Sequence, residues 1–252
     1  MSPAVSVVTV CRNALKDLQK TADSVFLQSA EDFEWIIIDG ASTDGTTEFL
    51  GSLDQPWIHS ISEPDDGIYD AMNKGLAKAS GEWIWFMNAG DQFHDQSSVQ
   101  KVAEAGPGYD ICFGESLVID SEGNELGPRS SVTPHSLPDC LERSQFTHGM
   151  VVSHQAFVAK RRLVPQFAHQ QYRFSADLDW MLRILSEPRR TVNLGMLARI
   201  DREGATLQNW KQSQYERFLI LARHFGTGKT LINHCTILLR RLRHGKRTRL
   251  WK

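Results

Sequence analysis

One stretch decides the fold: residues 5–40, VSVVTVCRNALKDLQKTADSVFLQSAEDFEWIIIDG. It begins with a short β-branched run, Val5–Val10, which is typical of a strand that is buried on both faces of a parallel sheet. Ala14–Leu27 then carries apolar residues at helical spacing, and Trp35–Ile38 is a second buried strand that ends at Asp39. A strand, a helix and a second strand in this order form a βαβ unit, so the stretch predicts a parallel sheet covered by helices.

The same alternation continues to about residue 113 and then weakens. Further predicted elements in the first part are helix Thr43–Leu53, strand Trp57–Ile61, helix Ile68–Ala79 closing at Ser80-Gly81, and strand Trp83–Met87. In the second part they are a hairpin of strands Cys112–Ile119 and Glu125–Leu126, a loop over 128–148, helix Asp177–Leu185, strand Thr191–Asp201, and helices Trp210–Phe225 and Leu231–Leu242. We predict one α/β domain over residues 1–204 and a helical, basic extension over residues 205–252.

Composition bounds the class of protein. The 252 residues suffice for one large α/β domain, and 41% hydrophobic with 23% charged residues excludes a disordered chain. The net charge of -2 hides an uneven distribution, because Gly226 to Lys252 holds eight Lys or Arg and no acid. The four cysteines form no CxxC pair, which favours reduced thiols. With no secretory signal pattern and no apolar run of ~20 residues, we expect a cytoplasmic protein, or one attached to a membrane only at its surface.

Polar side chains follow four of the predicted strands, at Arg12-Asn13, at Asp39, at Glu63 to Asp66 and at Asp91. Ligands of open α/β sheets bind beyond the carboxyl ends of the strands, so these groups converge on one edge. A carboxylate at Asp39 can accept hydrogen bonds from a base N–H or from ribose hydroxyls. The alternative is a simple capped turn, with Asp44 as N-cap of the next helix, and the pattern leaves both open.

Together, four stretches resemble the family 2 glycosyltransferases of the GT-A fold, in that family's order and spacing: Ser6–Val10, Ile38–Thr46, Ser62–Gly75 and Phe86–Asp91. The specific matches cover roughly residues 4–95 and 146–186, and the chain is most similar to bacterial exopolysaccharide transferases of the colanic-acid fucosyltransferase type. The resemblance implies a Rossmann-like, mixed but mostly parallel sheet flanked by helices, with a C-terminal helical extension. It also implies an enzyme that uses a nucleotide-sugar donor.

The resemblance assigns six residues to the donor site: Thr9, Arg12, Asp39, Asp65, Asp66 and Asn73. Asp39 matches the carboxylate that contacts the base, and Thr9 and Arg12 lie at the first strand end, where the family contacts the nucleoside. The other three match the segment that lines the nucleotide and the donor sugar. The alternative for Asp65-Asp66-Gly67 is a turn before a helix.

A divalent cation, Mn²⁺ or Mg²⁺, is implied by Asp91, which matches the last position of the family's acidic metal-binding motif. A hard cation needs oxygen ligands and can bridge two phosphates, so one carboxylate plus the donor diphosphate suffices. The chain departs from the fullest acidic pattern, because Asn88-Ala89-Gly90-Asp91 holds a single acid. The alternative for Asp91 is a helix or turn cap.

Two further stretches, His154–Phe157 and Tyr172–Trp180, resemble the acceptor half of the same family. Asp177 matches its general base, while Asp179 lies two residues on and points to a different helical face, so only one of them can aim at the donor. The alternative is that Asp177 only caps its helix, where the dipole favours an acid. His154 and Asp179 are candidates for contacts to the acceptor or the diphosphate.

The implied reaction is an inverting transfer to a hydroxyl of a glycan or lipid-linked acceptor, with Asp177 taking the hydroxyl proton. Two rival classes are a sugar-phosphate nucleotidyltransferase, whose Gly-rich basic N-terminal signature is absent, and a non-catalytic nucleotide-sugar binding module, which would need no base. Gly226–Thr230 is only half of a phosphate-binding loop motif. Because the other half is missing, we exclude a P-loop kinase.

The basic C-terminal tail suggests a place for the protein in the cell. Leu231–Leu242 mixes aliphatic and arginine residues, and the chain ends in a tryptophan and a lysine, which suits the headgroups of an anionic membrane. The alternative is a surface helix packed on the domain. We expect no nucleic-acid partner, because no stacking aromatics are interleaved with the basic residues.

Overall fold

The computed structural model describes residues 2–202 and 209–243, with side chains as far as residue 235. Its elements in chain order are β1 (Val5–Cys11), α1 (Leu15–Phe26), β2 (Phe33–Asp39), α2 (Thr46–Gly51), β3 (Ile58–Ser62), α3 (Ile68–Lys78), β4 (Trp83–Phe86), β5 (Gln92–Phe93), α4 (Ser98–Ala103), β6 (Ile111–Ile119), β7 (Glu125–Pro128), α5 (Arg129–Val132), β8 (Phe157–Lys160), α6 (Ala176–Ile184), β9 (Thr191–Asp201), α8 (Trp210–Phe225) and α9 (Thr227–Arg243). Short 3-10 helices η1 (Arg143–His148), η2 (His154–Ala156) and η3 (Arg161–Leu163) lie between them.

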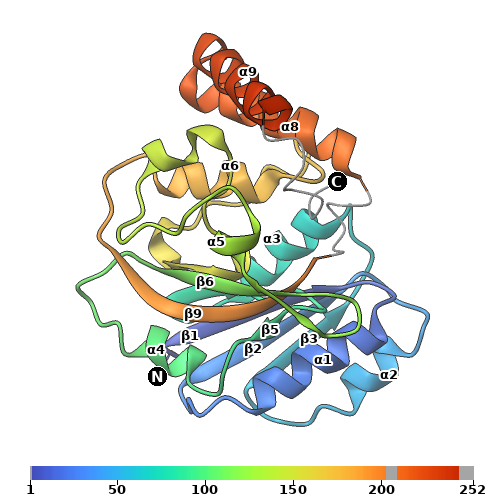
Figure 1. Ribbon diagram of the computed structural model, residues 1–252. Coiled ribbons are helices and arrows are strands. Elements are labelled where there is room, and N and C mark those ends of the chain that lie inside the picture. Colours follow the sequence, from blue (N-terminus) through green and yellow to red (C-terminus); the bar gives the residue numbers. More distant parts are fainter. Residues whose placement is uncertain (1, 203–208, 244–252) are drawn as a thin grey trace.

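One nine-stranded sheet forms the centre of the fold, in the order β3-β2-β1-β4-β8-β6-β9-β5, with β7 paired to β6. Strands β3, β2, β1 and β4 run parallel, as do β6 and β9, whereas β8 is antiparallel to both of its neighbours. Helices α1, α2 and α4 cover one face, and α3 and α6 lie on the other (Figure 1). The predicted fold class, a mixed and mostly parallel sheet flanked by helices, is confirmed.

Strands β1, β2 and β4 are buried along their whole length, as their unbroken apolar runs predict. Helix α3 packs directly across β1 and β2, and its Gly75 makes that approach possible. A Cβ atom at Gly75 would lie 2.4 Å from Cγ1 of Val8, closer than any side chain allows. The parallel strands are therefore held in a rigid layer whose carboxyl ends all meet at one edge.

Ser80-Gly81 has a different role from the predicted helix cap. Helix α3 ends at Lys78, and its C-cap residue Ala79 is already extended. The backbone N–H groups of Ser80 and Gly81 instead donate to Oε1 of the buried Glu34. A Cβ atom at Gly81 would lie 2.7 Å from the backbone nitrogen of Ser6, so glycine is needed there for close approach to β1.

Most predicted elements match the structure, and the hairpin of β6 and β7 is antiparallel as expected. Three short elements were not predicted, namely β5, α4 and β8. The predicted loop over residues 128–148 contains α5 and η1. Among the elements that were not predicted, β8 has the largest effect on the sheet topology, because it lies between β4 and β6 and joins the two parallel parts of the sheet.

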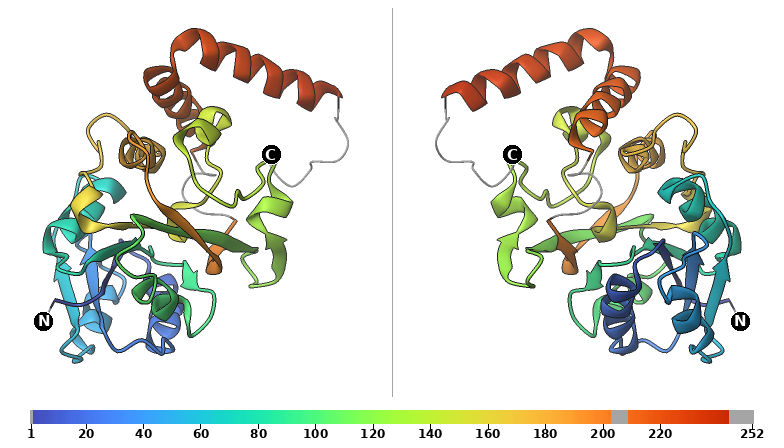
Figure 2. Two further views of the ribbon diagram at one scale, coloured as in Figure 1. Left: turned by 90° about the vertical axis from the view of Figure 1, so that its left-hand side faces the viewer. Right: turned by 90° about the vertical axis from the view of Figure 1, so that its right-hand side faces the viewer.

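The C-terminal helices α8 and α9 pack above α6, on the side of the molecule opposite α1 and α2 (Figure 2). Ile220 and Leu221 of α8 belong to the main hydrophobic core, and Asn233 of α9 donates a hydrogen bond to the carbonyl of Thr147. The predicted boundary at residue 204 falls within 203–208, and the predicted basic end of the tail within 244–252, both outside the described residues. In the parts of the chain that are described, no helix is long and apolar enough to cross a membrane.

Candidate active site

Asp39 ends β2 with its side chain completely buried. Its carboxylate accepts hydrogen bonds from the backbone N–H of Ser42 at 3.0 Å, from the Ser42 hydroxyl and from the Ser62 hydroxyl at 2.6 Å. The carboxylate therefore caps the turn after β2 and ties that turn to the end of β3. The N-cap of α2 is Gly45 and not the predicted Asp44, whose carboxylate instead accepts the N–H and hydroxyl of Thr46. Contact of Asp39 with a base or ribose stays a prediction.

The loops after β1 and β2 are joined to each other. The backbone N–H of Asn13 donates to the Ser42 hydroxyl at 2.6 Å, and Oδ1 of Asn13 accepts the N–H of Thr43 at 2.9 Å. Asn13 and Ala41 adopt left-handed backbone conformations, with φ of 49° and 55°. Such conformations in non-glycine residues cost on the order of 1 kcal/mol each and persist only where surrounding contacts enforce them. The two loops thus form one rigid unit at the edge of the sheet.

Arg12 and Asp65 meet Asp39 at this edge, around Gly40. A Cβ atom at Gly40 would lie 2.3 Å from Oδ2 of Asp65 and 3.1 Å from Cδ of Arg12. Asp65 also accepts the N–H of Gly67 at 2.8 Å, which is the turn that the alternative interpretation predicted. Asp66 is exposed next to it. Three of the six predicted donor-site residues, Arg12, Asp39 and Asp65, are therefore brought together.

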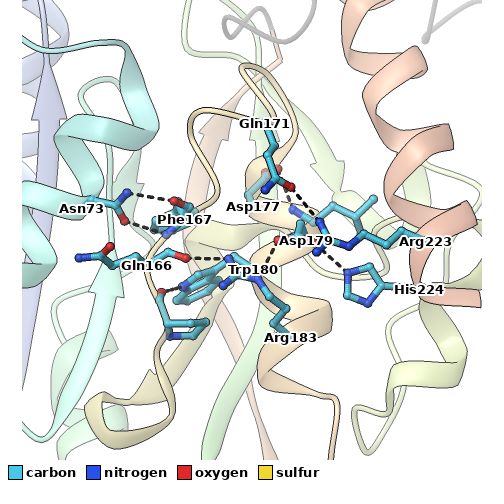
Figure 3. A network of polar contacts seen from close by, with 12 residues as sticks. Asn73, Gln166, Phe167, Gln171, Asp177, Asp179, Trp180, Arg183, Arg223 and His224 are labelled. Carbon is cyan, nitrogen blue, oxygen red and sulfur yellow. Dashed lines mark hydrogen bonds and ion pairs between the residues drawn. The ribbon is translucent and has the colours of Figure 1, made fainter.

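Thr9 and Asn73 lie inside the protein instead. The Thr9 hydroxyl donates to the carbonyl of Met87 at 2.7 Å and accepts Nε1–H of Trp35 at 2.8 Å. The Asn73 amide pairs with both backbone groups of Phe167, at 2.7 and 3.0 Å (Figure 3). These contacts hold β1 to β4 and the segment around Phe167 to α3. The predicted contacts of Thr9 and Asn73 to the nucleotide stay predictions, because the contacts that these two side chains make in the structure are to other parts of the protein.

Asp177 lies in the first turn of α6, and three groups orient its carboxylate. Oδ1 accepts the Tyr69 hydroxyl at 3.1 Å and the N–H of Leu178 at 2.9 Å, and Oδ2 is 3.4 Å from Nδ1 of His154. Burial raises the pKa of Asp177, but the hydrogen bond and charge of His154 and the charge of Arg217 outweigh it, so the pKa lies below its ordinary value. The carboxylate is ionised at neutral pH, as a general base has to be.

His154 connects Asp177 to the end of β4. Its Nε2 is 3.2 Å from Nδ2 of Asn88. Its Nδ1 lies 3.4 Å from Oδ2 of Asp177, so the ring contacts both groups. The predicted base and the predicted metal-binding stretch, 88–91, are therefore joined through one imidazole.

Asp91 is half-buried, and its Oδ2 accepts Nε2–H of Gln155 at 2.7 Å. Burial raises the pKa of Asp91 to about 6, against the charge of His154 and the Gln155 hydrogen bond, which lower it. Oδ1 of Asn88 is buried and has no hydrogen-bond partner among the described residues. Nowhere in those residues do three or more His, Cys, Asp or Glu side chains gather as a metal site. Two oxygen donors fit a hard cation that takes its other ligands from water or phosphate.

Asp179 points away from this cluster. It is 2% exposed, and its carboxylate lies 2.7 Å from Nε of Arg183 and 2.8 Å from Nε2 of His224 on α8 (Figure 3). Burial raises the pKa of Asp179, but the His224 hydrogen bond and the Arg183 charge bring it below its ordinary value. The two acids do face different sides of α6, and the structure gives Asp179 contacts that join α6 to α8.

Sequence reasoning missed three residues of the site, namely Tyr69, Gln155 and Arg217. Tyr69 is buried, stacks on Phe167, and donates to Asp177; burial and the Asp177 charge raise the pKa of its hydroxyl well above the ordinary value. Tyr69 lies within Ser62–Gly75 and Gln155 within His154–Phe157, two stretches that resemble the family, so the sequence did carry a signal for these two residues. Arg217 carries no signal in the sequence, because no motif surrounds it.

A curled, mostly parallel sheet with helices on both faces defines the GT-A fold of glycosyltransferases. The chain belongs to glycosyl transferase family 2, whose family model matches residues 6–165. It is 34% identical over 197 residues to an uncharacterized glycosyltransferase of Mycobacterium tuberculosis, covering 74% of this chain and 71% of that protein. A PGL/p-HBAD biosynthesis glycosyltransferase of Mycobacterium bovis is 29% identical, over 74% of this chain and 72% of that protein.

Solved structures share the fold. S. aureus TarS 1-349 superposes with a TM-score of 0.66 at 13% identity, over 92% of this chain and 72% of that one. The mannosyltransferase PcManGT from Pyrobaculum calidifontis, solved with GDP-Man and Mn²⁺, superposes with a TM-score of 0.57 at 15% identity, over 96% of this chain and 76% of that one. Family membership sets aside the nucleotidyltransferase and the non-catalytic module as rival classes.

Proposed function

We propose that this glycosyltransferase moves a sugar from a nucleotide diphosphate donor to a hydroxyl of a glycan or lipid-linked acceptor, with inversion at the anomeric carbon, in bacterial surface polysaccharide synthesis. The observation that carries the proposal is the row of contacts from Asp177 through His154 to Asn88, beside Asp91. This row puts an ionised carboxylate next to the loops at the carboxyl edge of the sheet. TarS was solved with UDP-GlcNAc, and the M. bovis relative is named for PGL/p-HBAD biosynthesis.

In the proposed reaction Asp177 takes the proton of the acceptor hydroxyl as that oxygen attacks the anomeric carbon. The bond from that carbon to the diphosphate breaks, and the nucleoside diphosphate leaves. His154 and Tyr69 hold the carboxylate in place, and Arg12, Asp39 and Asp65 surround the nucleotide. The predicted cation, Mn²⁺ or Mg²⁺, would be held by Asp91 and Asn88, and it would supply positive charge that stabilises the leaving diphosphate.

A thermal-shift panel tests the donor half of the proposal. The chain is melted with UDP-, GDP- and dTDP-sugars, each with Mn²⁺, with Mg²⁺ and with EDTA. A donor that binds the folded state raises the melting temperature, and we expect this for one nucleotide class, more strongly with metal. Release of the nucleoside diphosphate in the presence of candidate acceptors then measures transfer. A panel without any shift would contradict nucleotide-sugar binding, and full activity in excess EDTA would contradict the metal.

We also propose that the C-terminal tail holds the enzyme on the inner face of the cell membrane, where a lipid-linked acceptor would lie. On the described part of α9, Leu231 and Ile232 are 50% and 68% exposed, next to the exposed Lys229. The full chain should pellet with anionic vesicles at low salt and be released as salt rises. Leu231→Ser with Ile232→Ser should pellet less, and equal pelleting of neutral and anionic vesicles would contradict the charge-based attachment.

A further inference from the structure

Helix α8 carries a guanidinium nitrogen that has no hydrogen-bond partner among the described residues. Arg217 is half-buried, and its Nε is shielded from solvent without a hydrogen-bond partner in the described parts of the chain. Arg129 and Arg183 differ, because their guanidinium groups donate to backbone carbonyls or to a carboxylate. Removing a charged donor from water without a partner costs free energy. A donor atom that is shielded from solvent and has no partner is therefore a place where a ligand can be expected.

Two contacts made by neighbouring residues of α8 fix the position of Arg217. Glu216 is buried and accepts the backbone N–H groups of Arg173 and Phe174, at 3.1 and 2.8 Å. The buried Ser213 hydroxyl is 2.9 Å from the Ser175 hydroxyl. Residues 173–175 lead directly into α6, where Asp177 follows. Arg217 is thus anchored relative to the proposed base through the same short segment.

Arg217 lies among charged groups of both signs. Its charge lowers the pKa of Asp177, yet the two side chains form no ion pair within the described residues. Its charge also contributes to lowering the pKa of Arg129 and of His135, where burial is the largest cause. Glu115 is the acid near Arg129, and its carboxylate is already held by the N–H groups of Ser116 and Ser130. An anionic ligand would supply the hydrogen-bond acceptor that the Nε–H group of Arg217 lacks among the described residues.

We propose that Arg217 forms a subsite for a phosphate oxyanion of a substrate, beside the proposed base. The inference rests on the proposed function. The planar guanidinium matches a phosphate better than a point charge does, and it can donate two parallel hydrogen bonds. Two sources carry this group, the diphosphate of the donor and a phosphate in the acceptor. In either case α8 supplies part of the active site, although it lies outside the residues that the family model matches.

Calorimetric titration of the full chain tests the subsite, with Arg217→Gln as the variant and Lys211→Gln as the control. Lys211 is exposed on the same helix and loses the same charge. The donor arm compares a nucleoside diphosphate with the matching nucleoside. The acceptor arm adds inorganic phosphate to protein already saturated with that nucleoside diphosphate. Arg217→Met keeps the apolar stem and serves as a second variant, and melting curves check the fold of all variants.

We expect Arg217→Gln to lower the affinity for one of the two phosphate probes by about tenfold to a hundredfold. Its affinity for the nucleoside should remain unchanged, and Lys211→Gln should bind all probes as wild type does. Weakening of the nucleoside diphosphate assigns the subsite to the donor, and weakening of the added phosphate assigns it to the acceptor. If the variant bound each of the two phosphate probes with the affinity of wild type, the proposal would be overturned. Failure of both Arg217 variants to fold would also overturn it. If wild type bound no nucleoside diphosphate, the proposed function would fail, and inorganic phosphate would still decide on Arg217.

Discussion

The two halves of the site are built by different means. The donor half, residues 5–91, holds its polar groups with contacts between neighbouring loops, such as Asn13 with Ser42, 29 residues apart, and Asp39 with Ser62, 23 apart. The acceptor half, residues 146–225, depends on remote partners. Tyr69 and Asp177 are 108 residues apart. The difference teaches that the edge formed by the loops after β1, β2 and β3 is made within the first half of the chain, whereas the position of the base also depends on Tyr69 from the other half.

The largest expected effect separates the two acids of α6. Asp177→Asn should lower turnover by a factor on the order of 10²–10⁴ and leave nucleoside diphosphate affinity unchanged, because the base alone is removed. Asp179→Asn should act through stability, since it leaves Arg183 and His224 without their buried charge, at a cost on the order of 3 kcal/mol. Steady-state kinetics and melting curves measure both. Near-normal turnover in Asp177→Asn together with an inactive, fully stable Asp179→Asn would reverse the assignment.

A smaller effect should be confined to the donor half. Asp39→Ala should weaken nucleoside diphosphate and free nucleoside alike, because it removes a charged acceptor worth about 1.5–3 kcal/mol, or roughly tenfold to a hundredfold in affinity. Asp54→Ala is the control, since Asp54 is exposed and lies just before β3, away from the carboxyl ends of the strands. Calorimetric titration measures the affinity. An unchanged affinity in Asp39→Ala would leave Asp39 with only its turn-capping role.

The pH dependence probes the link between the halves, at Asp91. Its pKa is raised to about 6, so this carboxyl is protonated below about pH 6 while Asp177, whose pKa is lowered, stays ionised. Turnover should therefore fall by about tenfold per pH unit below pH 6, and saturating Mn²⁺ should move this limb to lower pH. A pH–rate profile with and without excess metal measures the limb. A limb that metal does not move would separate Asp91 from the cation.

The same raised pKa has a stability consequence with a definite sign. The protonated Asp91 carboxyl contributes stability that is fully present below its ordinary pKa near 3.8 and is lost as the pH rises through about 6. Metal-free Asp91→Asn should therefore melt higher than wild type at pH 8 and differ little from it at pH 4. An equal difference at both pH values would contradict the raised pKa.

The smallest expected effect tests one long-range contact. Tyr69→Phe removes the hydrogen bond to Asp177 but keeps the ring that stacks on Phe167. Turnover should fall about twofold to tenfold, the worth of one hydrogen bond, and the apparent pKa of the base should rise slightly. Unchanged kinetics would mean that His154 and the N–H of Leu178 orient the carboxylate without help.

The same contrast explains how much could be predicted from the sequence. Strand Thr191–Asp201 and helix Trp210–Phe225 were predicted with their observed bounds, because apolar periodicity is a local signal. Strand β8 was not, since four residues carry too little pattern and its pairing with β4 is decided by the fold. The strand-end acids were found, but the burial of Thr9 and Asn73 was not, because a motif does not show which side chains turn inward.

Asn13 and Ala41, held in left-handed conformations by contacts between their loops, have a consequence for the thermodynamics of association. The ordering of these loops is completed during folding, so a nucleotide that arrives at this edge meets a surface with little conformational entropy left to lose. Its binding should be driven by enthalpy, at a rate set by diffusion and charge rather than by loop closure. Ala41→Gly would loosen the loop, and the penalty should appear as an unfavourable entropy of nucleotide binding.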